Sequence, residues 1–168
     1  MGVRRYQDLD TWQLTEEFKR LVHALVKGSD QAFRHFKHRD QIFNSSGGPS
    51  KHVSEGFARF NPKEFCHFLD YGFSSVAETE NHLRDGIDWG YYPAEACEPI
   101  FHMARRCSKA ILGLKHSQQR YMAAQEERQR MDREEKRLRK RGWSKASSGR
   151  ESARCRTRAR PEGRAKGC

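Results

Sequence analysis

The amino-acid sequence predicts an all-α protein: an up-down antiparallel four-helix bundle, extended by a charged helix and ending in a disordered basic C-terminus. Apolar side chains recur at three- and four-residue spacing in successive segments, as they do on the buried face of a helix. No segment shows the alternation of a strand, and the connections between the apolar stripes are short. Helices joined by short connections pack antiparallel to their neighbours in the chain.

The first and third helices have the clearest signals. The first is expected over residues 10–27, with Gly28 at its end. The third is expected over residues 62–89, because Asn61 can cap it and Pro62 suits the first helical position. The apolar stripe of this third helix, which we expect to be buried, consists of Phe65, Phe68, Leu69, Gly72, Val76 and Leu83.

The second helix is harder to place within residues 30–60. Three phenylalanines can line one helix face, but residues 45–50 combine serine, glycine and proline, which interrupt helices. We therefore expect a second helix that is broken or strongly kinked near Pro49. A fourth apolar stripe follows the turn at Pro93 and continues to Tyr121.

Charge divides the chain into three expected segments. The bundle, residues 1–122, has 17 basic and 15 acidic side chains, whereas residues 123–168 have 16 basic and seven acidic ones. Residues 123–141 keep strong helix formers and place acids four residues before bases, which predicts a charged helical extension. Residues 142–168 are rich in Arg, Ser, Gly and Ala, cannot form a core, and are expected to be a disordered basic tail.

The composition argues against membrane insertion and secretion. No run of 18 apolar residues exists, and the first residues lack the apolar core of a signal peptide. The five cysteines are odd in number and form no Cys-x-x-Cys pair, which suits reduced thiols. We expect a cytoplasmic protein.

Candidate catalytic and metal-binding groups are sparse. His35 and His38 are three residues apart and could share a cation, but solvent-facing histidines among basic residues are the simpler interpretation. Glu78 and Glu80 could supply two carboxylates, yet no histidine or cysteine completes a ligand set at a suitable spacing. We therefore expect no enzymatic activity, no cofactor and no metal site.

Five motifs in register resemble one protein family. They are YQDLDTWQ at residues 6–13, VSEGFAR at 53–59, KEF with FL at 63–69, Ser75 with Glu78 and Glu80, and Gly90-Tyr91. Over residues 6–115 they resemble the bacterial four helix bundle proteins, also called ribosomal-RNA intervening-sequence proteins. The chain departs from the family pattern at His52, where an asparagine is usual, and at Gly47, Gly48 and Pro49.

The resemblance implies a small bundle that assembles as a homopentamer and has no enzymatic activity. A structural relative of the family, the accessory variability determinant of diversity-generating retroelements, is a basic pentamer that binds nucleic acid and a reverse transcriptase. RNA or DNA and a reverse transcriptase are therefore candidate partners.

Several family-motif residues are candidates for structural or interface roles. Glu55 and Arg59, four residues apart, suit a charge-assisted pair or an interface contact, and Gly56 suits a close approach of helices. The complete set of family-motif candidates is Trp12, Glu55, Gly56, Arg59 and Glu78.

The basic segment gives the main functional prediction. Clustered lysines and arginines displace counterions from a phosphate backbone, so they bind nucleic acid with little sequence preference. The basic segment therefore predicts binding of RNA or DNA, by a chain that the family resemblance implies is a homo-oligomer. The alternative is a protein-interaction scaffold without a nucleic-acid ligand, in which this segment is only solvated helix and unselected extension. The candidate nucleic-acid-binding residues are Arg128, Arg130, Arg133, Lys136, Arg137, Arg139, Lys140 and Arg141.

Overall fold

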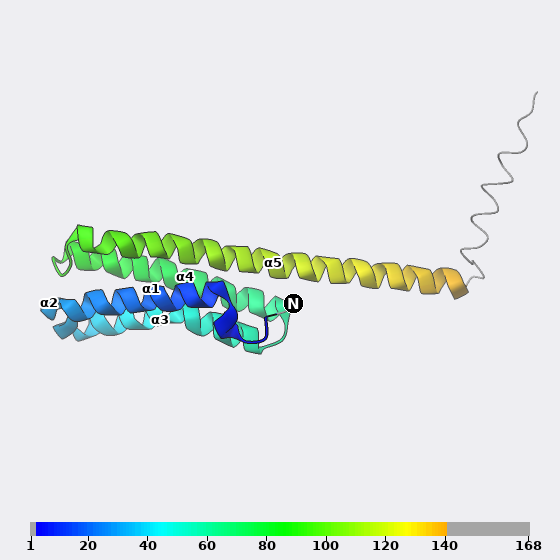
Figure 1. Ribbon diagram of the computed structural model, residues 1–168, viewed down its shortest axis with the longest axis horizontal. Helices are drawn as coiled ribbons and strands as arrows, with labels where there is room; N and C mark the ends of the chain where they lie inside the picture. Colours follow the sequence, from blue (N-terminus) through cyan, green and yellow to red (C-terminus); the bar gives the residue numbers. More distant parts are fainter. Residues whose placement is uncertain (1–2, 141–168) are drawn as a thin grey trace, which may run out of the picture. The chain divides into compact units, whose positions relative to one another are not determined.

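Every regular element in the described part of the chain is helical. The computed structural model describes residues 3–140, which form one short 3-10 helix and five α-helices (Figure 1). The elements are η1 (Tyr6–Asp8), α1 (Asp10–Gly28), α2 (Asp30–Arg34), α3 (Phe36–Ala58), α4 (Pro62–Asp88) and α5 (Ala94–Lys140). The predicted all-α class is confirmed, with five helices where four were expected. Among these helices, none has the combination of length and apolar composition that crossing a bilayer requires.

The chain divides into two compact units, Met1–Ala123 and Ala124–Cys168. Helix α5 contributes residues to both units. The first unit contains the hydrophobic core. In the second unit, each side chain from Ala124 to Lys140 is exposed. Arg141 and the expected disordered tail at 142–168 lie outside the described residues.

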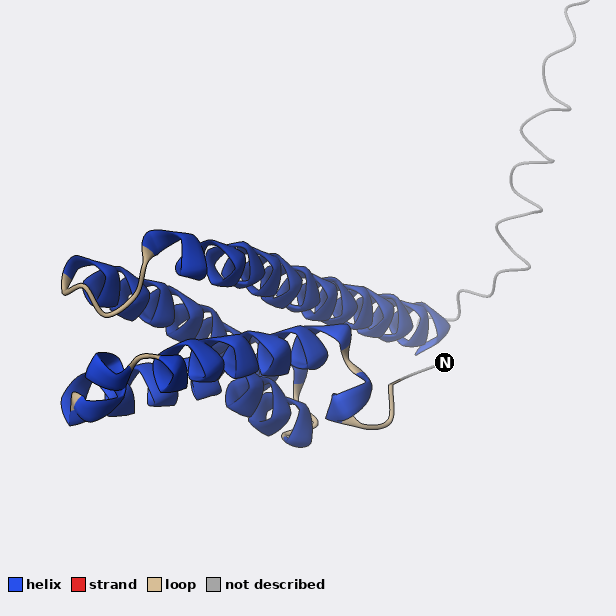
Figure 2. Cartoon of the chain, turned by 60° about the vertical axis from the view of Figure 1, so that its left-hand side comes forward, coloured by secondary structure: helices blue, strands red, loops and turns tan. Residues whose placement is uncertain are grey.

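Helix α4 begins where the sequence predicts. The Asn61 side-chain oxygen accepts hydrogen bonds from the backbone amides of Lys63, at 3.0 Å, and Glu64, at 3.4 Å. These bonds satisfy two of the amides that the first turn of a helix leaves without a partner. Only residues 59–61 join α3 to α4, and the loops of the first unit are short (Figure 2).

The region around residues 30–60 differs from the prediction. A separate helix, α2, is capped by the Ser29 hydroxyl, which accepts a hydrogen bond from the Ala32 amide at 3.3 Å. The break follows at His35, and α3 then continues through Pro49 to its end. Pro49 is buried where α4 passes it, so packing between the two helices offsets the missing backbone hydrogen bond. The expectation of a helix broken near Pro49 is wrong.

Helices α3 and α4 approach each other closely through small side chains. A Cβ atom added to Gly48 would lie 2.5 Å from the Ser75 hydroxyl oxygen, far inside normal contact distance. The Thr79 hydroxyl donates a hydrogen bond to the Ser45 hydroxyl at 3.0 Å across the same interface. The serine- and glycine-rich segment that suggested a helix break is therefore a surface on which α4 packs.

The core of the first unit combines apolar side chains from the four long helices. Leu69 on α4 is completely buried, whereas its neighbour Phe68, which we expected in the core, is only half-buried. Adjacent helical residues point about 100° apart, so Phe68 does not share the direction in which Leu69 enters the core. The completely buried apolar side chains include Phe18, Val22, Val26, Ile42, Val53, Leu69, Val76, Leu83 and Ile111.

A buried thiol and a buried hydroxyl connect α5 to α1 within the first unit. The Cys107 thiol donates to the Leu14 carbonyl oxygen at 3.4 Å, and the Thr11 hydroxyl donates to the Ala110 carbonyl oxygen at 3.4 Å. Burial raises the pKa of the Cys107 thiol to about 12 and that of Cys97 to about 11. Both thiols are therefore protonated at neutral pH.

The close contact at Gly48 predicts that a glycine-to-alanine substitution lowers the free energy of unfolding there, but not at a helical glycine with open space around it. Gly48→Ala is expected to destabilise the protein by about 1 to 3 kcal/mol, because the new Cβ overlaps Ser75. Gly113→Ala is the matched control: nothing lies within 4 Å of its added Cβ, and alanine favours the helix by about 0.5 to 1 kcal/mol. Urea unfolding of the two variants measures the difference. The Ser75→Gly change should restore part of the stability of Gly48→Ala; equal effects of the two alanine substitutions would contradict the packing of α3 against α4.

Candidate functional site

The predicted nucleic-acid-binding residues lie on α5 in the second unit. All of them except Arg141 are described, and all of these are exposed. Three are paired along their own helix: Lys136 with Asp132 at 2.7 Å, Arg137 with Glu134 at 3.9 Å, and Arg139 with Glu135 at 3.2 Å. These exposed pairs contribute only a few tenths of a kcal/mol each, about 0.3 to 0.5, and a phosphate could compete for the cations.

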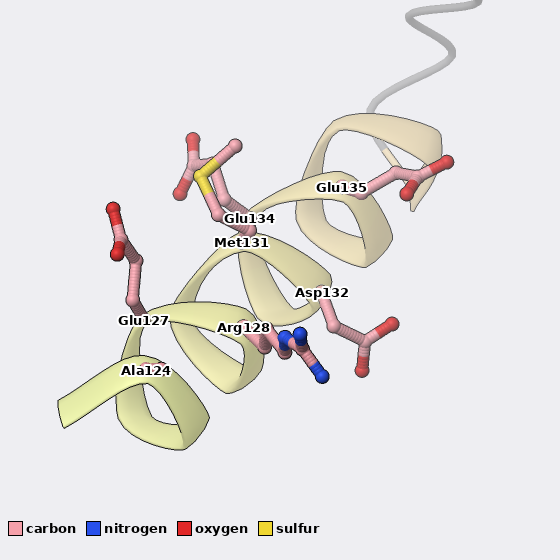
Figure 3. A pocket seen from close by; sticks show the side chains of 7 residues that line it. All are labelled: Ala124, Glu127, Arg128, Met131, Asp132, Glu134 and Glu135. Carbon is pink, nitrogen blue, oxygen red and sulfur yellow. The ribbon is translucent and has the colours of Figure 1, made fainter. Parts of the chain in front are cut away.

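Acidic side chains are interleaved with the basic ones on this part of α5. Residues 124–140 contain seven basic and five acidic side chains, whereas residues 141–168 contain nine basic and two acidic ones. Figure 3 shows a depression on the helix surface where carboxylates outnumber the single guanidinium and splay away from the helix. In the part of the second unit that the structure describes, the cations without an ion pair are Arg128, Arg130, Arg133 and Lys140.

The family-motif residues Trp12 and Gly56 have packing roles. The Trp12 ring is half-buried and meets the Tyr6 ring edge-on, with 5.4 Å between centroids. A Cβ atom added to Gly56 would lie 2.5 Å from the Phe65 ring and 2.8 Å from the Phe68 Cβ atom. Gly56 therefore lies at a second point of close approach between α3 and α4.

Glu55 and Arg59 do not pair with each other in the structure. The Glu55 carboxylate lies 3.6 Å from His52 Nδ1, and Arg59 Nε lies 4.0 Å from the Glu64 carboxylate on α4. The Arg59 guanidinium also covers the Phe68 ring, at 5.5 Å from its centroid. Arg59 follows the last residue of α3, and its guanidinium contacts Glu64 and Phe68 on α4 instead of Glu55.

Glu78 is exposed on α4, and its carboxylate lies 3.8 Å from His82 Nε2. Glu80 is two residues further along the helix, a spacing that directs the two carboxylates to different sides. Within residues 3–140, no group of three or more histidine, cysteine, aspartate or glutamate side chains is arranged to hold a metal ion.

A histidine and tyrosine cluster that sequence reasoning missed connects the start of α3 to the turn after α4. His38 Nε2 and the Tyr92 hydroxyl lie 3.0 Å apart, and His35 Nδ1 and the Tyr91 hydroxyl also lie 3.0 Å apart. His38 is only 2% exposed and His35 is half-buried, so the interpretation of both as solvent-facing is wrong. The sequence signal for this cluster was the pair Tyr91-Tyr92 a few residues after Gly86. In the structure, the ring of Tyr92 occupies the space that a Cβ atom at Gly86 would fill.

Burial controls the protonation of the His38–Tyr92 pair. Desolvation lowers the pKa of His38, the nearby His82 and His35 lower it further, and Asp85 partly opposes them. Burial also raises the pKa of the Tyr92 hydroxyl far above its ordinary value. At neutral pH the His38–Tyr92 contact is therefore a hydrogen bond between two uncharged groups.

The lowered pKa of His38 predicts a loss of stability in acid. Because the unfolded chain binds a proton at the ordinary histidine pKa of about 6.5, the free energy of unfolding should fall as the pH drops below this value and continue to fall down to the lowered folded pKa. Urea midpoints measured at a series of pH values test this expectation. His38→Gln should show a smaller decrease, and His102→Gln, which changes an exposed histidine, should behave like the wild type. An unaltered acid loss in His38→Gln would contradict the assignment.

The fold and its surface define an all-helical protein with a basic segment at the end of its last helix. Comparison with known families then places it: residues 7–113 match the model of the family described as 23S rRNA-intervening sequence protein, and the chain belongs to this family. The predicted relationship to the ribosomal-RNA intervening-sequence proteins is confirmed. No curated protein matches the chain. The family match ends within the first unit, before the basic segment begins.

Proposed function

We propose that this protein is a non-enzymatic, homo-oligomeric accessory protein that binds RNA or DNA through its basic C-terminal segment, with five subunits as the expected number. Its four long helices, α1, α3, α4 and α5, form an up-down antiparallel bundle that supplies the assembling body. Membership of the 23S rRNA-intervening sequence family supports an association with RNA.

The observation that carries the proposal is the uneven placement of charge. The first unit has nearly equal numbers of acidic and basic side chains, whereas residues 124–168 have 16 basic and seven acidic ones. Four cations on the described part of this segment are exposed and form no ion pair there. Exposed cations of this kind release counterions from phosphates, which is the main source of sequence-independent affinity.

Oligomerisation would strengthen such a contact. Each subunit contributes one basic segment, and subunits that share an assembly hold their segments at high local concentration. A weak contact by one segment then becomes a stable contact by several. This argument connects the proposed assembly to the proposed ligand.

A protein-interaction scaffold is the second candidate function. The interleaved carboxylates on residues 124–140 favour it, because a helix with nearly balanced charges pairs with another charged helix more readily than with phosphate. In that case the ligand would be an acidic or mixed-charge protein, and nucleic acid would bind only weakly.

Salt-dependent binding distinguishes the two functions. The full chain should bind a labelled oligouridylate with an affinity that falls steeply with salt, by a logarithmic slope of about −0.7 for each phosphate contacted. Replacing Arg137, Arg139, Lys140 and Arg141 by glutamine should reduce the slope, since glutamine keeps helix propensity but releases no counterions. Fluorescence anisotropy at several salt concentrations provides the measurement.

The matched control removes the same number of exposed cations from the first unit, through glutamine substitutions at Arg20, Lys51, Lys63 and Arg105. This variant should keep most of the slope. If both variants lost the same share, charge as such and not the basic segment would determine binding. Strong binding to a polyglutamate competitor, with none to RNA, would favour the scaffold.

The number of subunits is a separate prediction. Native mass spectrometry of the full chain at micromolar concentration should show a closed assembly near five subunits, because the first unit exposes several large aromatic side chains that an interface could bury. A monomer under these conditions would refute the assembly.

A further inference from the structure

The start of α3 holds an arginine between two exposed aromatic rings. The Arg39 guanidinium carbon lies 4.8 Å from the centroid of the Phe36 ring and 5.3 Å from that of the Phe33 ring. Phe36 is 67% exposed and Phe33 is 41% exposed, although nearby His38 is buried. We call Phe33, Phe36 and Arg39 the aromatic corner.

Hydrogen bonds hold the guanidinium of the aromatic corner in place. Arg39 donates to one Asp40 carboxylate oxygen from Nε, at 3.1 Å, and from Nη2, at 3.0 Å. Its Nη1 also donates to the Phe33 carbonyl oxygen at 3.4 Å. A planar ligand that stacks here therefore meets a surface that is already ordered, and little side-chain entropy is lost on binding.

Three cations, Arg34, Lys37 and Arg39, lie at or beside the aromatic corner, together with the carboxylates of Asp30 and Asp40. Lys37 is exposed and forms no ion pair with any described residue, and the exposed Arg34 is only loosely paired with Asp30, at 3.8 Å. Helix α3 also begins here without a side-chain cap, so the amides of its first turn present the positive end of the helix dipole. Aromatic rings beside an unpaired lysine and a helix start without a side-chain cap match the two chemical parts of a nucleotide, its base and its phosphate.

We propose that the aromatic corner binds single-stranded nucleic acid: an unpaired base stacks on Phe36, while Lys37 and the first-turn amides of α3 contact the adjacent phosphates. This inference rests on the proposed function and adds a contact in the first unit that depends on bases and not on charge alone. A base fits the corner better than an apolar protein surface does, because the guanidinium interrupts the apolar area between the two rings.

The test compares two ligands of equal length and charge: an oligouridylate and the corresponding abasic ribose-phosphate oligomer. In the full chain, Phe36→Ala should weaken binding of the oligouridylate about fivefold and leave binding of the abasic oligomer unchanged, since only the first ligand can stack. Phe36→Trp should restore binding. Phe73→Ala, which removes another partly exposed phenylalanine from α4, is the matched control and should have no effect. Lys37→Gln should lower the logarithmic salt slope by about 0.7 for both ligands.

Three results would overturn the proposal, and each is distinct from failure of the proposed function. An unchanged oligouridylate affinity in Phe36→Ala would show that no base stacks there, even if the salt-dependent binding by the basic segment persists. Equal weakening for both ligands would indicate a general loss of charge contacts. A smaller assembly of Phe36→Ala in native mass spectrometry would identify the corner as a contact between copies of the chain. Absence of any RNA binding by the wild type would instead refute the proposed function, and this inference with it.

Discussion

Helix α4 can lie close against α3 because the side chains between them are small, and much of the first unit follows from this contact. It is made where Gly48 faces Ser75, and it holds α3 helical through Pro49 despite the missing backbone donor. Helix α4 ends at Asp88, and the turn that follows, in which Gly90 has a positive φ of 71°, places Tyr92 against His38 on α3. The same two helices thus position both the buried cluster at one end and the residues that join them at the other.

Local sequence signals predicted the helices whose apolar stripes are continuous, and failed where packing between helices determines the structure. The cap at Asn61 and the apolar stripe that follows it predicted a helix over residues 62–89, and α4 runs from Pro62 to Asp88. Around Pro49, serine and glycine predicted a break, because propensity describes an isolated segment and contains no information about α4. The apolar periodicity of α4 is compatible with either Phe68 or Leu69 at the centre of the buried face. The packing of the helices buries Leu69 completely and leaves Phe68 half-buried.

The candidate site was predictable as composition but not as arrangement. The excess of arginine and lysine after residue 123 is evident in the sequence, and so is the i, i+4 spacing of Glu135 and Arg139, whereas the i, i+3 pair of Glu134 with Arg137 was not predicted. His38 shows the converse case. Its basic neighbours in the sequence suggested a surface position, but its side chain points to Tyr92, a residue 54 positions away. Contacts over such distances in the chain leave no periodic signal that a single sequence can reveal.

The buried thiols of α5 have a chemical consequence of their own. Only a thiolate reacts quickly with electrophiles and oxidants, and burial keeps Cys97 and Cys107 protonated. Alkylation at these two positions therefore requires that α5 open locally and expose the sulfur atoms to water. The Cys107 thiol donates to the Leu14 carbonyl oxygen on α1. The rate of its modification by a thiol reagent therefore reports how often α5 and α1 separate locally while the rest of the protein stays native.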